Sequence, residues 1–116
     1  MTGRRRLLVA LFWGALAFAL VMALLPKPPR LPGDPSDKIQ HIIAFAALAA
    51  LASAAYARTP LVKLGVGLSA FGALIELLQL IPPLHRDGSV ADWIADTLAV
   101  AAVLAFTRLR RRGKGR

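Results

Sequence analysis

The sequence of 116 residues contains no cysteine, which excludes disulfide bonds, thiolate metal sites and cysteine nucleophiles. Aromatic residues make up only 7% of the chain and charged residues only 18%, whereas an average soluble domain has about 25% charged residues. Acidic residues are especially scarce, with six Asp and Glu against fifteen Lys and Arg. What the chain has in excess is apolar: 57% of its residues are hydrophobic, and its length allows a single domain.

These apolar residues gather in four long runs. The runs cover residues 7–25, 39–57, 61–81 and 90–106, and a proline-containing break separates each from the next. A helix needs about 20 mostly apolar residues to cross a bilayer, and proline interrupts a helix because it lacks an N–H donor. The sequence therefore predicts an all-α, integral membrane four-helix bundle formed by a single domain of residues 1–116, with a basic cytoplasmic tail at 107–116.

Lysine and arginine predict the orientation of this bundle. Eleven of the fifteen lie at the two termini and around the turn between the second and third runs, and four lie in the other two breaks. Because positively charged loops stay on the cytoplasmic side, we expect both termini in the cytoplasm and the chain in the cytoplasmic (inner) membrane. The net charge of +9 is then a topology signal and an attraction to anionic lipids, and no nucleic acid is expected as a partner.

Two alternatives concern the ends of the chain. A nucleic-acid-binding tail at 108–116 would also explain the basic residues there. A cleaved signal peptide at 1–25 would explain the arginines before the first run, but this run is longer than the usual apolar segment of about 7–15 residues. We therefore expect the first run to remain as a helix.

Ionisable residues on the other side of the membrane point to the functional site. Glu76 lies near the end of the third run, Asp96 lies near the start of the fourth, and His41 lies one turn into the second. At about 1.5 Å per residue, Glu76 and Asp96 are each roughly 7 Å or more inside the span. A charge in the membrane costs about 2.5–3.5 kcal/mol even on the permissive insertion scale. We therefore expect Glu76 and Asp96 to be paired, protonated or beside a water-filled cavity.

A seam of small residues indicates where Glu76 points. Gly65, Ser69 and Gly72 precede Glu76 and Gln79 at alternating spacings of four and three, so all five share one helix face. Small residues let neighbouring helices approach closely in a membrane. We expect this face to turn toward the bundle interior.

Single residues among the polar set also have structural interpretations. Asp37 and Asp92 lie near helix starts, where the helix macrodipole favours acids. Lys38 and Arg86 could extend their charges to the interface, and Trp93 is expected in the aromatic belt of the membrane surface. These interpretations do not explain why Glu76 and Asp96 lie so deep.

Residues 37–106 resemble the VanZ-like family of small multi-pass membrane proteins. The resemblance rests on an Asp-Lys-x-x-His motif at 37–41, a Glu-x-x-Gln motif at 76–79 followed by Arg86, and the residues 92–96, which resemble the family's Asp-x-x-x-Asn signature. Asp96 stands where many members have Asn, which makes this site more acidic, and Ala99 stands where many have Gly. The resemblance implies a protein of the cell envelope, and the family is named after a teicoplanin-resistance determinant.

Together these residues predict one polar, acidic site that faces the periplasm or the outside. We expect it to recognise a lipid or a lipid-linked envelope head group, which makes the protein a binding or accessory protein, and the resemblance links it to glycopeptide resistance. Expected partners are membrane lipids, a second copy of the chain or another membrane protein. The expected ligand-binding residues are Asp37, Lys38, His41, Glu76, Gln79, Arg86, Asp92 and Asp96.

Two other functions compete with this one. A membrane-embedded enzyme could use His41, Glu76, Asp92 and Asp96 as general acids and bases or as ligands of a divalent cation, with an anionic envelope lipid or lipid-linked intermediate as substrate. No HExxH, P-loop or GxSxG motif supports an enzyme of a known type. An ion- or proton-coupled transporter is the third hypothesis, and the scarcity of polar residues in the cytoplasmic halves of the runs disfavours it.

Overall fold

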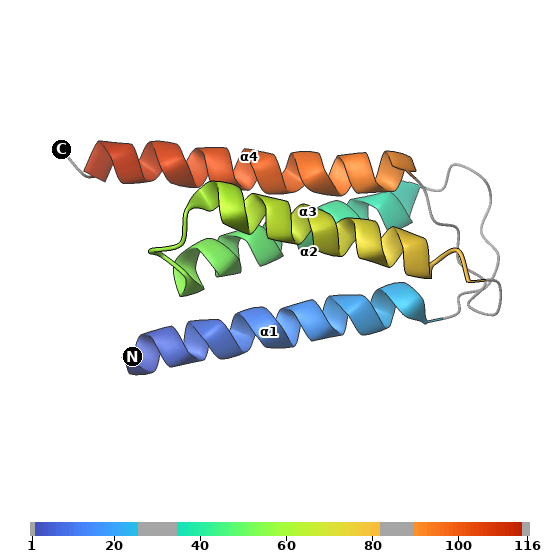
Figure 1. The fold of residues 1–116 in the computed structure, drawn as a ribbon, viewed down its shortest axis with the longest axis horizontal. Coiled ribbons are helices and arrows are strands. Elements are labelled where there is room, and N and C mark those ends of the chain that lie inside the picture. Colours follow the sequence, from blue (N-terminus) through green and yellow to red (C-terminus); the bar gives the residue numbers. More distant parts are fainter. Residues whose placement is uncertain (1, 26–34, 82–89, 115–116) are drawn as a thin grey trace.

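The computed structural model describes residues 2–25, 35–81 and 90–114, without the side chains of 35–38 and 114. In these parts the chain is all-helical, with helices α1 (Gly3–Leu24), α2 (Pro35–Ala55), α3 (Leu61–Leu78) and α4 (Val90–Lys114). The helices run along the length of the molecule, with both termini and the α2–α3 turn at the same end (Figure 1). The predicted all-α architecture of four helices is therefore confirmed.

The C-terminal ends of the last two helices differ from the predicted bounds. α4 continues to Lys114 and does not stop at Phe106, because Arg and Lys are good helix formers and cations are favourable at a helix C-terminus. The stretch expected as a tail is therefore mostly helical. α3 ends at Leu78 and not at Ile81, because Pro82 disfavours helical geometry in the residue before it.

The first two helices each begin four residues before the predicted starts at 7 and 39. At α1 the side chain of Thr2 accepts a hydrogen bond from the backbone N–H of Arg5 at 3.1 Å, which caps the helix upstream of its apolar run. At α2 the first helical residue is Pro35, whose fixed backbone angle suits the first turn. α2 ends at Ala55, two residues before the predicted end.

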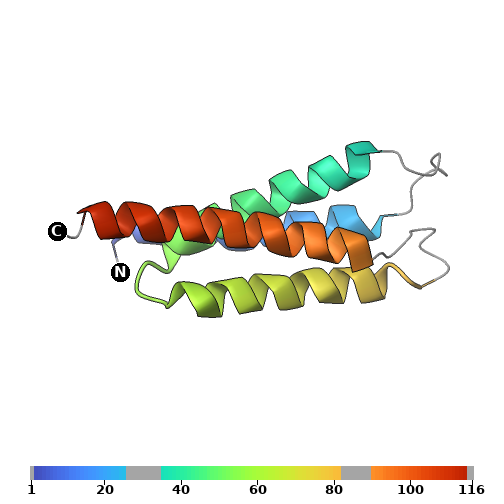
Figure 2. The same ribbon diagram turned by 90° about the horizontal axis from the view of Figure 1, so that it is seen from above.

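Helix α2 is the centre of the packing. It packs against α1, α3 and α4, whereas α1 has few contacts with α3, so α1 is attached to the bundle mainly through α2. Figure 2 shows α4 lying across α2 and α3. The buried apolar core joins all four helices and consists of Phe12, Ala23, Phe45, Leu48, Ala49, Ala52, Ala55, Leu68, Ile75, Val100 and Leu104.

Two glycines of the predicted seam hold α3 against its neighbours. A Cβ atom on Gly72 would lie 3.4 Å from the ring of Phe45 and 3.5 Å from Trp93, and one on Gly65 would lie 3.2 Å from Leu104 Cδ1. A Cβ at Gly72 would just make van der Waals contact and one at Gly65 would be tight, so side chains larger than a methyl group would not fit at this spacing of the helices. The seam therefore turns inward, as the spacing predicts.

Arginines from both ends of the chain bind the C-terminus of α2. The Nε–H of Arg5 donates to the carbonyl of Ala55 at 3.3 Å, and the guanidinium of Arg111 donates to the carbonyl of Ser53 at 2.8 Å. The last carbonyls of a helix have no partner within the helix, and they carry partial negative charge. α2 has no basic residue in its own last turn, so α1 and α4 supply the cations.

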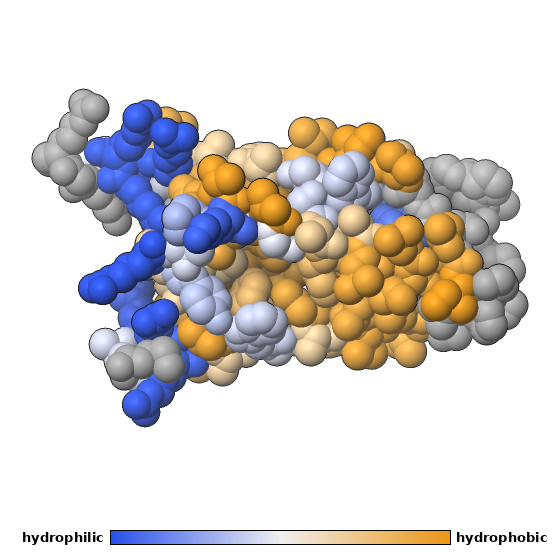
Figure 3. All heavy atoms as spheres, viewed as in Figure 1, coloured by the Kyte–Doolittle hydropathy of each residue, from blue (hydrophilic) through white to orange (hydrophobic). Residues whose placement is uncertain are grey.

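The outer surface of the bundle is unusually apolar. Large hydrophobic side chains stand exposed along all the helices, among them Phe18 at 67%, Val62 at 77% and Leu98 at 64%. Hydrophilic residues gather at the end that carries the termini (Figure 3). Three helices, α1, α3 and α4, are long and apolar enough to cross a membrane, and the apolar part of α2 is the shorter stretch Ile39–Ala55. An apolar surface of this kind needs lipid or protein to cover it.

The packing of α3 generates a stability prediction. Gly72→Leu should destabilise the purified protein by about 1–3 kcal/mol, because the new side chain meets the rings of Phe45 and Trp93 in a filled interior. The matched control is Gly67→Leu on the same helix, where a Cβ meets nothing within 4 Å. Thermal unfolding in detergent compares the two variants. Equal unfolding temperatures would contradict the close contact at Gly72.

Candidate functional site

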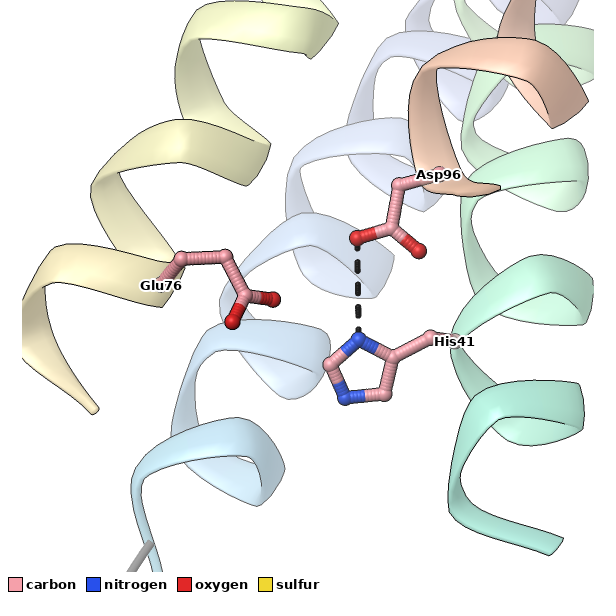
Figure 4. Close-up of side chains that lie close together, drawn as sticks. All are labelled: His41, Glu76 and Asp96. Carbon is pink, nitrogen blue, oxygen red and sulfur yellow. Dashed lines mark ion pairs between the residues drawn. The ribbon is translucent and has the colours of Figure 1, made fainter. Parts of the chain in front are cut away.

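Three ionisable side chains from three helices meet at one point of the bundle. His41 comes from α2, Glu76 from α3 and Asp96 from α4, and one ligand atom from each lies within 4.8 Å of the others. Figure 4 shows the two carboxyl groups directed toward the imidazole from different helices. We call these three residues the His–Glu–Asp cluster.

The sequence places these side chains through helix periodicity. Glu76 lies one turn beyond Gly72 on the inward face of α3 and is only 8% exposed. Asp96 lies one turn before Val100 on the buried face of α4. The imidazole of His41 lies one turn before Phe45 on α2, and Phe45 packs at Gly72. The same close approach that buries the apolar core therefore brings the three polar groups together.

Asp96 is the most deeply buried member of the cluster, with 1% of its side chain exposed. Its Oδ2 lies 3.6 Å from Nδ1 of His41, which is ion-pair distance but too long for a good hydrogen bond (Figure 4). Within the described part of the chain, neither carboxylate oxygen of Asp96 accepts a hydrogen bond. A buried polar group without hydrogen bonds costs free energy of folding. The burial of Asp96 therefore destabilises the fold, and this makes Asp96 a candidate functional residue.

A cavity of about 510 Å³ lies beside the cluster, between α1 and α2. Among the described residues, His41 and Gln40 are the polar ones that line it, so His41 lines the cavity and also belongs to the cluster. The remaining lining residues are apolar: Ala15, Phe18, Ala19, Met22, Ala23, Ala44, Phe45, Ala47, Leu48 and Ile75. The arrangement is an apolar chamber with a polar group on its wall.

This cavity was not predicted from the sequence, because the apolar run of α1 contains no ionisable residue that would mark it. The available signal was Ala15, Ala19 and Ala23, which are spaced four apart and therefore share one face of α1. These small side chains face Ala44 and Ala47 of α2 across the cavity. Apposed small residues leave space that larger side chains would have filled.

Two predicted residues are occupied by structural hydrogen bonds. The side-chain amide of Gln79, which is 2% exposed, donates to the carbonyl of Ala23 at 2.9 Å and ties α3 to the end of α1. Trp93, for which an interfacial position stays a prediction, is half-buried against Gly72, and its indole N–H donates to the carbonyl of Ser69 at 3.0 Å. Both side chains fix helix positions around the cluster.

Of the other four predicted site residues, only Asp92 has a described side chain, and it is not a member of the cluster. Asp92 lies one turn before Asp96, is half-buried and makes further polar or electrostatic interactions of its own. Asp37 and Lys38 belong to the first turn of α2, and their side chains are not among those described. Arg86 lies outside the described residues.

Among the described residues, Gln79 forms a buried hydrogen bond and Asp96 does not, so substitutions at the two positions should affect stability differently. In protein treated with a chelator, Asp96→Asn should unfold at the same temperature as the wild type or higher, because the amide removes a buried charge that has no hydrogen bond. Gln79→Leu should lose about 1 kcal/mol, because it leaves the Ala23 carbonyl without its donor. Thermal unfolding of both variants makes the measurement. A large fall in the unfolding temperature of Asp96→Asn would show that Asp96 stabilises the fold, and would contradict this prediction.

Comparison with known proteins identifies no relative with a known function. No family model, curated protein or solved structure matches the chain. The VanZ-like resemblance therefore stays a prediction from sequence motifs, and the function has to be argued from the cluster and the cavity.

Proposed function

We propose that this chain is a VanZ-like integral membrane protein of the cell envelope that binds a lipid or a lipid-linked intermediate. The apolar chain of the ligand occupies the cavity between α1 and α2, and its polar head group lies at the His–Glu–Asp cluster. The protein then acts as a binding or accessory protein, and its contribution to glycopeptide resistance is to hold or present such a ligand.

The observation that carries this proposal is the position of His41 on the cavity wall. The cavity, at about 510 Å³, is within the usual range of ligand pockets, about 300–1,000 Å³. The described residues that line it are apolar apart from Gln40 and His41, and His41 lies 3.6 Å from the carboxylate of Asp96. An amphiphile has this distribution of polarity, with one long apolar part and one polar end.

The surface of the bundle supports a location in the membrane. α1, α3 and α4 can each cross a bilayer by length and hydropathy, and their exposed large hydrophobic residues would contact lipid. The basic residues of both termini lie at one end of the bundle (Figure 3). By the positive-inside rule that end is cytoplasmic, and the cluster faces the outer leaflet.

A membrane-embedded enzyme is the second candidate, and the pairing of His41 with Asp96 favours it. An imidazole and a carboxylate side by side are groups that general acid–base catalysis commonly uses. Such an enzyme would act on the lipid that the cavity holds. Turnover of that lipid by the wild type but not by His41→Ala would favour the enzyme over the binding protein.

The orientation can be tested with reporter fusions. Fusions at the N-terminus, at the C-terminus and after residue 33 should report cytoplasm, cytoplasm and periplasm respectively, because eleven of the fifteen basic residues lie at the termini and the α2–α3 turn. Periplasmic termini would place the cluster at the cytoplasmic leaflet. That result would contradict the proposed access to envelope lipids.

The cavity gives a direct test of lipid binding. Ala44→Phe adds an aromatic ring to the cavity wall and should remove most of the lipid that co-purifies with the protein, as measured by mass spectrometry. The matched control is Ala70→Phe on the exposed face of α3, away from the cavity lining, and should retain the lipid. Thermal unfolding confirms that both variants are folded. Equal lipid in Ala44→Phe, Ala70→Phe and wild type would contradict the proposal.

A further inference from the structure

We propose that the His–Glu–Asp cluster binds a divalent transition-metal ion of the Zn²⁺ type. Three different helices each supply one potential ligand, and the three ligand atoms lie within 4.8 Å of one another. His41 and Asp96 each lie six residues from the nearest helix end and Glu76 lies two residues from the end of α3, so all three belong to helical backbone. Ligands on rigid elements give a preformed site.

The donor set suits this class of ion. The cluster offers three protein ligands, the number found in open zinc sites, which keep a fourth position for water or substrate, and its imidazole is a ligand that suits Zn²⁺ and the neighbouring transition metals. Hard cations such as Mg²⁺ and Ca²⁺ prefer oxygen ligands alone, so the histidine selects against them. Ligand atoms of a tetrahedral zinc lie about 3.3 Å apart, given bond lengths near 2.0 Å. The atoms of the cluster need to approach by roughly 1.5 Å at most, which side-chain rotation of Glu76 and Asp96 can supply.

The state of Asp96 is the independent observation that points to a ligand. Its side chain is 99% buried, its oxygens accept no hydrogen bond from the described residues, and it is directed into the cluster (Figure 4). Replacing this carboxylate with a neutral group would relieve the cost of burial, yet the chain keeps an acid here. A metal ion offsets that cost by bonding the oxygen directly, since buried charges are paired or coordinate metals.

The cavity leaves one coordination position of the proposed ion accessible. His41 lines the cavity while Asp96 is enclosed by the helices, so the fourth coordination position lies toward the cavity. An ion there would bind an anionic oxygen of a head group or activate a water molecule. The metal site goes beyond lipid binding and does not require it, because its ligands all belong to this chain.

Zinc binding by the purified full-length chain tests the inference. The protein is prepared in detergent with a tag that contains no histidine, stripped with a chelator and titrated with Zn²⁺. The wild type should bind one ion per chain. His41→Ala, Glu76→Gln and Asp96→Asn should each weaken binding by at least about tenfold, since even outer-shell partners of a metal site contribute that much.

Two control variants make the measurement specific. His85→Ala removes the only other histidine of the sequence, and Ser53→Ala removes a buried hydroxyl on α2 that lies roughly 18 Å along the helix from His41. Both should bind zinc like the wild type. Loss of binding in His85→Ala with retention in His41→Ala would overturn the assignment. A wild type that binds no more zinc than the triple variant, or that binds Mg²⁺ in preference, would also overturn it.

Lipid analysis of the same preparations separates the two proposals. Lipid retained in a protein that binds no zinc would exclude the metal site and leave lipid binding intact. Zinc bound at one ion per chain without any retained lipid would support the metal site and contradict the proposed lipid binding.

Discussion

Close contact between α2, α3 and α4 is the constraint on which the rest of the structure depends. Gly72 allows it, because the Phe45 ring and Trp93 occupy the space that a side chain larger than a methyl group would need. Around this point the indole of Trp93 is hydrogen-bonded to the backbone of α3, and the hydroxyls of Ser69 and Thr97 lie 2.9 Å apart. Glu76 and Asp96 lie one turn further along α3 and α4, on the same inward faces. When the helices pack at this distance, the two acids therefore lie close together. The polar cluster is thus a product of the packing.

Such a cluster opposes the stability of the fold that creates it. Asp96 is enclosed with only a long ion pair to His41, and the nearby cavity removes packing contacts between α1 and α2. Groups arranged at a cost in stability mark functional sites. A bound ion would compensate the burial of Asp96, and a bound lipid would fill the cavity between α1 and α2. The apolar surface of the bundle would face the surrounding lipid.

Much of this could be predicted from the sequence, because the strongest signals were periodic. The four apolar runs gave the four helices, and the spacing of Gly72, Glu76 and their neighbours gave the inward face of α3. Helix ends were harder, since arginine continues a helix as readily as leucine and the prediction treated charge as a boundary. The cavity and the burial of Trp93 depend on distances between helices. The pattern of hydropathy along a sequence does not predict the distances between helices, so neither feature could be predicted.

The arginines at the end of α2 connect two properties that are usually considered apart. Arg5 and Arg111 belong to the clusters of positive charge that favour the cytoplasm, and each also donates a hydrogen bond to a terminal carbonyl of α2. The same side chains therefore carry positive charge at one end of the bundle and fasten its outer helices. Exchanging these charges would remove the hydrogen bonds that hold α1 and α4 to the central helix, whatever its effect on the direction of insertion.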